Sequence, residues 1–302
     1  MKTRASLSVC ALLVTATFLL SAPAAAIDRE RGVKLGEKAP DFTYPDRYGN
    51  LVSLHDYEGK KVILFFWVSW CICRDQLPLL EKFREQNKSG NYEIISVSVD
   101  AQGERYVNPI ADLAGVKYPV LLDRRADTAR LYHYPATPAV FLIDEAGAVK
   151  HQYITEFELS KDATRAELES FLNEPPVKST KPADSNISDL RAALEKQLEQ
   201  TPDDVNARRK LAGVLMDTGD AKAAVPHWET VVSKNKRSCP DIFSLATAQH
   251  LAGDDAGALK NWKSAAKCDP TNYIFYRTVQ SFEDPNQFYS KEKMKALYIG
   301  PK

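Results

Sequence analysis

The chain has 302 residues, of which 44% are hydrophobic and 26% are charged, a mix that excludes a largely disordered or collagen-like protein. Its 40 basic and 40 acidic residues cancel, so the excess of positive charge that nucleic-acid-binding proteins carry is missing, and no nucleic-acid partner is expected. At about 150 residues per domain, the length suggests two domains.

The N-terminus has the pattern of a secretory signal. Two basic residues, Lys2 and Arg4, precede the apolar run 7–20, and three alanines follow at 24–26. The run is shorter than the roughly 18 apolar residues that cross a bilayer, and small residues mark a cleavage site. We therefore predict a signal peptide over 1–26 and a soluble, exported mature protein, periplasmic or otherwise outside the cytoplasm. An uncleaved anchor is the alternative.

Residues 27–174 alternate between strand patterns and helix patterns. The stretch 62–68, VILFFWV, is continuously apolar, which is typical of a strand that is buried on both faces. This alternation predicts an α/β domain with a mostly parallel sheet. Further strands are predicted at 94–99, 120–122, 139–143 and 149–154, and helices at 74–86, 104–114, 127–132 and 161–172.

Cys71 and Cys73 lie between the first strand and the first helix of this domain. A cysteine at a helix N-terminus meets unpaired backbone N–H groups and the positive end of the helix dipole, and both favour the thiolate. We therefore predict that Cys71 is a nucleophile with a lowered pKa, and Arg74 adds positive charge nearby. Pro78 is expected to kink the helix. Thr137-Pro138, directly before a strand, is a candidate cis-proline.

The composition changes after the α/β domain. Residues 175–185 contain three prolines and are predicted to form a linker. Residues 186–302 show no strand pattern and repeat with a period of 34 residues, a spacing that resembles the tetratricopeptide repeat family. This resemblance implies antiparallel helix pairs with a concave surface that binds a client or partner protein. The repeated residues are Leu211, Gly219, Ala224 and Trp228, then Leu245, Gly253, Ala258 and Trp262.

A second pair of cysteines, Cys239 and Cys268, falls at the start of one predicted repeat helix and the end of the next. These two ends are neighbours in an antiparallel helix hairpin, and an exported protein can keep a disulfide. We therefore predict a structural disulfide between them, with a second redox pair as the alternative.

The first domain resembles the TlpA/ResA-type thiol–disulfide oxidoreductases, a branch of the thioredoxin fold related to redoxin and AhpC/TSA proteins. The resemblance covers about residues 33–173 and rests on the segments 36–42, 59–62, 66–71, 137–138 and 141–144. It implies a thioredoxin-like domain and a protein disulfide oxidoreductase, reductase or isomerase. Cys71 would attack a client disulfide and Cys73 would resolve the adduct, while Trp70, Thr137 and Pro138 would contact the substrate. A membrane thiol carrier would supply electrons, and no cofactor is expected.

The cysteine motif departs from the family pattern Trp-Cys-x-x-Cys, because Trp70-Cys71-Ile72-Cys73 is one residue short. A disulfide across a single residue is strained, and a strained disulfide is easier to reduce. We therefore expect a stronger oxidant, or a more isomerase-like centre, than an ordinary thioredoxin. Phe65 stands where thioredoxins have a buried acid, so the sequence names no general base, and Glu81 and Asp100 are only candidates.

Three other functions are considered for the motif. Cys71 and Cys73 with His133 could bind Cu(I) or zinc, which would make the chain a metal-binding chaperone. The chain could also be a redox-inactive adaptor that acts through its repeats. Peroxidase activity is disfavoured because Val68 stands where peroxidatic sites have a threonine.

Overall fold

The computed structural model describes residues 31–88, 90–178 and 187–289. These residues belong to one compact unit that begins at Arg31. The predicted signal peptide, most of the predicted linker and the residues after Tyr289 lie outside the described part. Within it, no helix is both long and apolar enough to cross a membrane.

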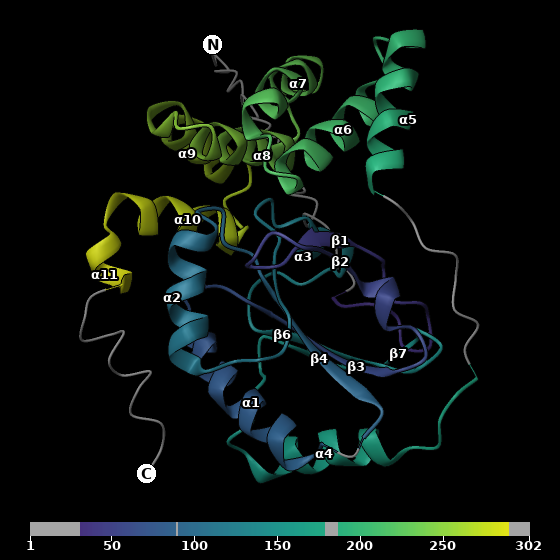
Figure 1. The fold of residues 1–302 in the computed structure, drawn as a ribbon. Helices are drawn as coiled ribbons and strands as arrows, with labels where there is room; N and C mark the ends of the chain where they lie inside the picture. Colours follow the sequence, from purple (N-terminus) through teal and green to yellow (C-terminus); the bar gives the residue numbers. More distant parts are fainter. Residues whose placement is uncertain (1–30, 89, 179–186, 290–302) are drawn as a thin grey trace, which may run out of the picture. The chain divides into compact units, whose positions relative to one another are not determined.

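A five-stranded sheet lies at the centre of the α/β region (Figure 1). The order of its strands is β5 (Val120–Leu122), β4 (Tyr92–Ser98), β3 (Lys61–Trp67), β6 (Ala139–Ile143) and β7 (Val149–Ile154). β3, β4 and β5 are parallel, but β6 is antiparallel to both β3 and β7. The sheet therefore departs from the predicted parallel arrangement at β6, which runs opposite to the other strands of this sheet. A tight turn at Asp144, whose side chain accepts hydrogen bonds from two backbone N–H groups, joins β6 to β7 without a crossover helix.

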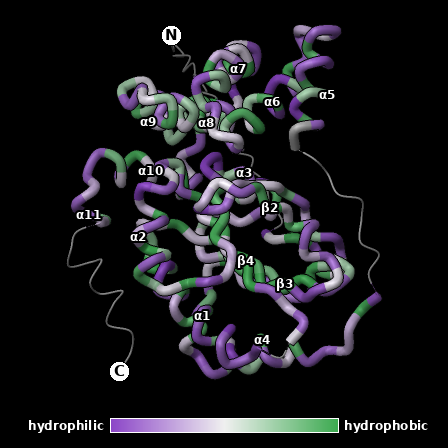
Figure 2. Tube along the Cα trace, in the orientation of Figure 1, coloured by the Kyte–Doolittle hydropathy of each residue, from purple (hydrophilic) through white to green (hydrophobic). Residues whose placement is uncertain are grey.

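Alternate residues of β3 point into two separate hydrophobic cores. Ile63, Phe65 and Trp67 pack against the helices α1 (Gln76–Gln86), α2 (Glu104–Ala114) and α4 (Asp162–Asn173). The other core contains Val62, Leu64 and Phe66. It also contains Tyr44 of the N-terminal hairpin β1–β2 (Thr43–Pro45 and Leu51–Ser53) and residues next to that hairpin. Figure 2 shows the resulting concentration of hydrophobic residues on β3 and β4. Three short helices complete the region, namely 3₁₀ helices at Leu54–Tyr57 and Ile72–Asp75 and α3 (Asp127–Leu131).

The C-terminal region is entirely helical where it is described. The fold class, a thioredoxin-like α/β domain followed by an all-α region, is confirmed. Polar N-caps recur at 34-residue spacing, Asp204, Ser238 and Asn272 in one series and Asp220 and Asp254 in the other, and each accepts a backbone N–H. The helices are α5 (Ile187–Gln200), α6 (Val205–Asp217), α7 (Ala221–Lys234), α8 (Cys239–Leu251), α9 (Asp255–Cys268), α10 (Tyr273–Glu283) and α11 (Pro285–Tyr289).

A disulfide joins Cys239, the first residue of α8, to Cys268, the last residue of α9, with their Cα atoms 5.5 Å apart. The pair closes a loop of 29 residues in sequence. In the chain-entropy model a cross-link of this span stabilises the folded state by about 3.5 kcal/mol. Trp228 and Trp262, at the large-aromatic position of the repeat, are both buried in this region.

The α/β region and the helical region share a core and several polar contacts. The hydrophobic cluster that contains Phe66 also contains Phe243 of α8 and Phe275 of α10. Arg125, just after β5, is buried and donates to the carbonyl of Gly213 at 3.1 Å and to Asp217 at 2.7 Å, both in α6. The helical region is therefore packed on the α/β region rather than joined to it only through the chain.

Candidate functional site

The cysteine motif lies where β3 ends. Cys71 caps a short 3₁₀ helix, Ile72–Asp75, and its sulfur accepts the backbone N–H of Cys73 at 3.2 Å. α1 follows directly, so the helix predicted from residue 74 begins with a 3₁₀ turn. Pro78 is the third residue of α1, in the first turn, where N–H groups need no partner within the helix.

The two thiols are in different environments. A hydrogen bond from the Cys73 thiol lowers the pKa of Cys71 to about 7, helped by the Cys73 backbone N–H, Thr137 and the charge of Arg74, and opposed by burial. Burial raises the pKa of Cys73, and the neighbouring Cys71 sulfur raises it further. Cys71 is half-buried and Cys73 is buried, and both are free thiols. This arrangement supplies one thiolate near neutral pH and one protonated thiol beside it.

The Thr137-Pro138 bond is cis, and Thr137 lies against both cysteines. The Cys71 sulfur lies 3.8 Å from the Thr137 carbonyl oxygen, and the Cys73 sulfur lies 3.7 Å from the Thr137 hydroxyl. Pro138 and Cys73 line a common pocket. Four of the predicted site residues, Cys71, Cys73, Thr137 and Pro138, are thus brought together.

The pocket beside the cysteines has a volume of about 500 Å³. Ile72, Cys73 and Pro138 form one side of it, and the loop between β7 and α4 forms another, through residues that include Phe157 and Glu158. Sequence reasoning missed this loop because it carries no motif. The pocket is large enough to hold a peptide side chain next to Cys73.

Trp70 lies beside Cys71 in the chain but is only 9% exposed. Its ring packs edge-on against Tyr273 of α10, with the ring centroids 5.6 Å apart. Most of the Trp70 surface is therefore covered by the chain itself. The exposed apolar side chain of the motif is Ile72, at 80%.

Asp100, one of the two candidate acids, supports the active-site loop. Its carboxylate accepts the backbone N–H of Ser69 at 2.8 Å and the hydroxyls of Ser69 and Ser98, each at 2.5 Å. Burial raises the pKa of Asp100 to about 6 against the effect of these hydrogen bonds. On the other side of the loop, Arg74 donates to the Ser69 carbonyl at 2.7 Å.

Glu81, the other candidate acid, has partners elsewhere. Its carboxylate accepts hydrogen bonds from the Arg84 side chain and from the backbone N–H of Lys117.

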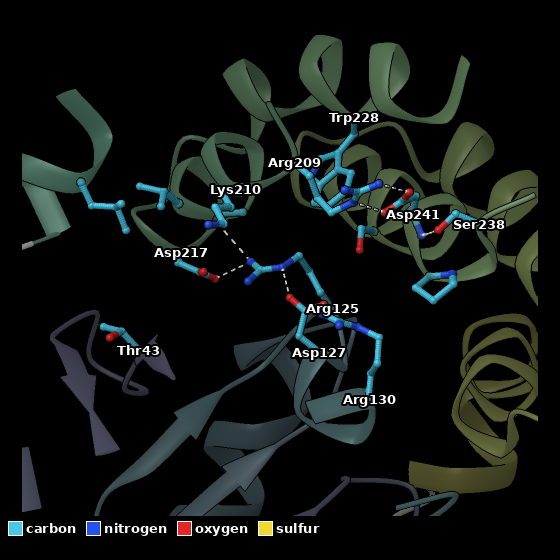
Figure 3. Close-up of a pocket in the computed structure, with 15 residues that line it drawn as sticks. Thr43, Arg125, Asp127, Arg130, Arg209, Lys210, Asp217, Trp228, Ser238 and Asp241 are labelled. Carbon is cyan, nitrogen blue, oxygen red and sulfur yellow. Dashed lines mark hydrogen bonds and ion pairs between the residues drawn. The ribbon is translucent and has the colours of Figure 1, made fainter. Parts of the chain in front are cut away.

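A second hollow, of about 530 Å³, lies between α6, α8 and the α/β region (Figure 3). Arg125 stands between Asp217 and Asp127, and Arg209 forms a two-pronged ion pair with Asp241 at 2.7 and 2.8 Å. The hollow is also lined by two exposed cations, Arg130 and Lys210. Its three carboxylates, Asp127, Asp217 and Asp241, therefore face four cations, which leaves one net positive charge on the lining.

His133 was the third residue of the proposed metal site. Its backbone has a φ of 52°, and its carbonyl accepts the backbone N–H of Gly32 at 3.0 Å. Among the described residues, no three side chains of histidine, cysteine, aspartate or glutamate are grouped closely enough to hold a metal ion.

Comparison with known proteins places the match in the α/β region. Residues 35–152 match the model of the AhpC/TSA family. The thiol-disulfide oxidoreductase ResA of Geobacillus kaustophilus is 35% identical over 134 residues, which cover 44% of this chain and 76% of the relative. The thioredoxin-like protein YneN of Bacillus subtilis is 30% identical over 129 residues, which cover 42% of this chain and 75% of the relative.

Solved structures show the same partial coverage. A crystal structure described as a thiol:disulfide interchange protein DsbE from Chlorobium tepidum is 30% identical, with a TM-score of 0.43. The alignment covers 47% of this chain and 99% of that one.

Proposed function

Because the chain belongs to the TlpA/ResA-type thiol–disulfide oxidoreductases, we propose that it exchanges disulfides with exported client proteins through Cys71 and Cys73. The observation that carries the proposal is the contrast between the two thiols, one with its pKa lowered to about 7 and one with its pKa raised by burial. A thiolate is the attacking species in thiol–disulfide exchange, and a protonated neighbour is held back until an adduct has formed.

The reaction proceeds in two exchanges. The Cys71 thiolate attacks one sulfur of a client disulfide, a Cys71–client disulfide forms, and the other client sulfur leaves as a thiolate. Cys73 then gives up its proton, which the departing client thiolates accept, and attacks the Cys71 sulfur. The client leaves with both cysteines reduced, and a Cys71–Cys73 disulfide remains. Thr137 and Pro138 hold the client strand beside the sulfurs.

The direction of electron flow depends on the reduction potential of the Cys71–Cys73 disulfide. The shortened motif favours an oxidant or isomerase, in which the same steps run from the Cys71–Cys73 disulfide toward a reduced client. For the reductive direction, we propose that a membrane thiol carrier re-reduces the pair.

Trapping of client adducts tests the order of attack. In Cys73→Ser, the first exchange proceeds but the adduct cannot be resolved, so clients should accumulate on Cys71 and be visible as bands that a reductant removes. The matched control, Cys71→Ser with Cys73 intact, should give none, because Cys73 is buried. Adducts on Cys71→Ser, or none on Cys73→Ser, would show that the roles are wrongly assigned.

We propose the same domain organisation that the sequence predicts. Residues 1–26 would direct export and be removed, 27–174 would form the redox domain, 175–185 the linker, and 186–302 tetratricopeptide-like repeats. The 34-residue spacing of the helix caps supports the repeats. Loss of residues 1–26 from the purified exported protein, read by mass, is the expected evidence of cleavage.

We further propose that the repeats bind a partner protein at the hollow of Figure 3. Two features support this site. It is open space between α6 and α8, and its lining has one more cation than carboxylate, with Arg130 and Lys210 exposed, which suits an acidic segment of a partner. A metal-binding or adaptor role for the cysteine motif has no comparable support, since both thiols are arranged for exchange chemistry.

A further inference from the structure

Helix α10 begins beside the active-site loop. Tyr273, its first residue, packs against Trp70, the neighbour of Cys71 in the chain. The two residues are 203 positions apart in the sequence, so only the folded chain brings α10 to the cysteine motif. The start of this helix therefore lies beside the loop that carries Cys71.

The position of α10 is fixed by contacts further along it and by α11. Gln102 of the α/β region donates to the Ser281 hydroxyl at 2.9 Å, and both side chains are buried. The ring of Tyr289 stacks on Tyr106 with centroids 3.9 Å apart, and its hydroxyl lies 2.8 Å from the hydroxyl of Ser69. The helix is therefore held as a rigid neighbour of the loop that carries Cys71.

Exposed apolar side chains occur both in the cysteine motif and on α10. Seven large hydrophobic side chains are exposed among the described residues, and three of them are Ile72, Tyr273 and Tyr276, with exposed fractions of 80%, 39% and 51%. Ile72 lies between the two cysteines. Tyr273 and Tyr276 are three residues apart on α10 and therefore lie on the same side of the helix. We call Tyr273 and Tyr276 the aromatic shelf.

One cation borders the aromatic shelf. The guanidinium of Arg277 lies 5.3 Å from the centroid of the Tyr273 ring, and its Nε donates to the Tyr273 hydroxyl at 2.8 Å. Apolar side chains exposed next to a reactive thiolate suit the apolar residues of an unfolded chain. The cation disfavours a basic residue at the same place.

We propose that the aromatic shelf is the part of the client site contributed by the helical region, and that it selects client cysteines flanked by an aromatic or large aliphatic residue. The inference rests on the proposed exchange chemistry at Cys71. The occupant is an extended client polypeptide, whose cysteine reaches Cys71 while the flanking side chain packs on Tyr273 and Tyr276. The aromatic shelf acts in binding alone and takes no part in the exchange of electrons.

Two peptides that differ in one residue test the proposal on the full chain. Each carries a cysteine as a mixed disulfide with 5-thio-2-nitrobenzoate, flanked by phenylalanine in one peptide and by glycine in the other. Attack by Cys71 releases the chromophore. Packing of one aromatic ring predicts a kcat/KM about five-fold higher for the phenylalanine peptide. In Tyr276→Ser this ratio should fall toward one.

Tyr48→Ser is the matched control. Tyr48 is also an exposed tyrosine, at 74%, but it lies in the turn between β1 and β2, so its loss should leave the ratio as in the wild type. A ratio near one in an active wild type, or an unchanged ratio in Tyr276→Ser, overturns the proposal. If neither peptide releases chromophore, the exchange chemistry itself is wrong.

A second copy of the chain is the competing occupant of the aromatic shelf. In that case the wild type sediments as a dimer, Tyr276→Ser sediments as a monomer, and the peptide ratio is the same for both. That result would also overturn the client site.

Discussion

At the scale of single residues, the main feature of the site is that two chemically identical thiols lie in different environments. Cys71 lies at the cap of a 3₁₀ helix, where it accepts hydrogen bonds, and Cys73 is placed in the core behind it. The first and largest cause of the lowered pKa of Cys71 is the thiol of Cys73. In the proposed reaction, Cys73 would therefore both activate Cys71 and resolve the adduct.

The rate of Cys71 alkylation should report this effect as a function of pH. Only the thiolate reacts, so the rate with iodoacetamide should rise with pH and level off above an inflection near pH 7. Cys73→Ala removes the thiol donor, so the inflection should move up by about one pH unit and the rate at pH 7 should fall several-fold. Cys73→Ser keeps a hydroxyl donor and should retain most of the shift. Equal inflections in all three proteins would exclude Cys73 as the cause.

At the scale of elements, the short Cys-x-Cys turn is the feature that departs from the family. A glycine inserted after Ile72 restores the usual spacing and should relax the disulfide that the two cysteines form. Titration in a glutathione buffer, read by alkylation and mass, should give the wild type a potential above about −270 mV, the value of a thioredoxin. The insertion should lower it by about 30 mV or more, a tenfold change in equilibrium constant. A wild-type potential below that of thioredoxin would contradict the strain argument.

The elements also show what the sequence could and could not predict. α2 begins and ends where its apolar period begins and ends, at Glu104 and Ala114. The strands β1 and β2 were missed because their short sequences, TYP and LVS, are not continuously apolar, unlike the equally short β5, VLL. The antiparallel pairing of β6 was missed because the apolar pattern of a buried strand carries no direction. The contact between Trp70 and Tyr273 depends on tertiary packing alone, so no local sequence pattern predicts it.

At the scale of the whole molecule, the ion pair between Arg125 and Asp217 links the α/β region to α6. Both side chains are buried and lie 2.7 Å apart. Asp217→Asn leaves Arg125 with Asp127 as its remaining carboxylate partner and should lower the free energy of unfolding by about 3 kcal/mol, measured by urea denaturation. The exposed ion pair between Asp203 and Lys234 is the control. Asp203→Asn should unfold at the same urea concentration as the wild type. If the urea midpoint of Asp217→Asn equals that of the wild type, the ion pair between Arg125 and Asp217 does not hold the two regions together.

The shared core that contains Phe66, Phe243 and Phe275 has a practical consequence for anyone who expresses part of this protein. A fragment that stops in the 175–185 segment contains every cysteine of the motif, yet it strips Trp70 of its aromatic cover and exposes apolar core to water. Such a fragment should aggregate. Its rates of disulfide exchange would be those of a loop that is more exposed to water than in the whole chain. The shortest piece that keeps the native surroundings of Cys71 reaches at least to Tyr289.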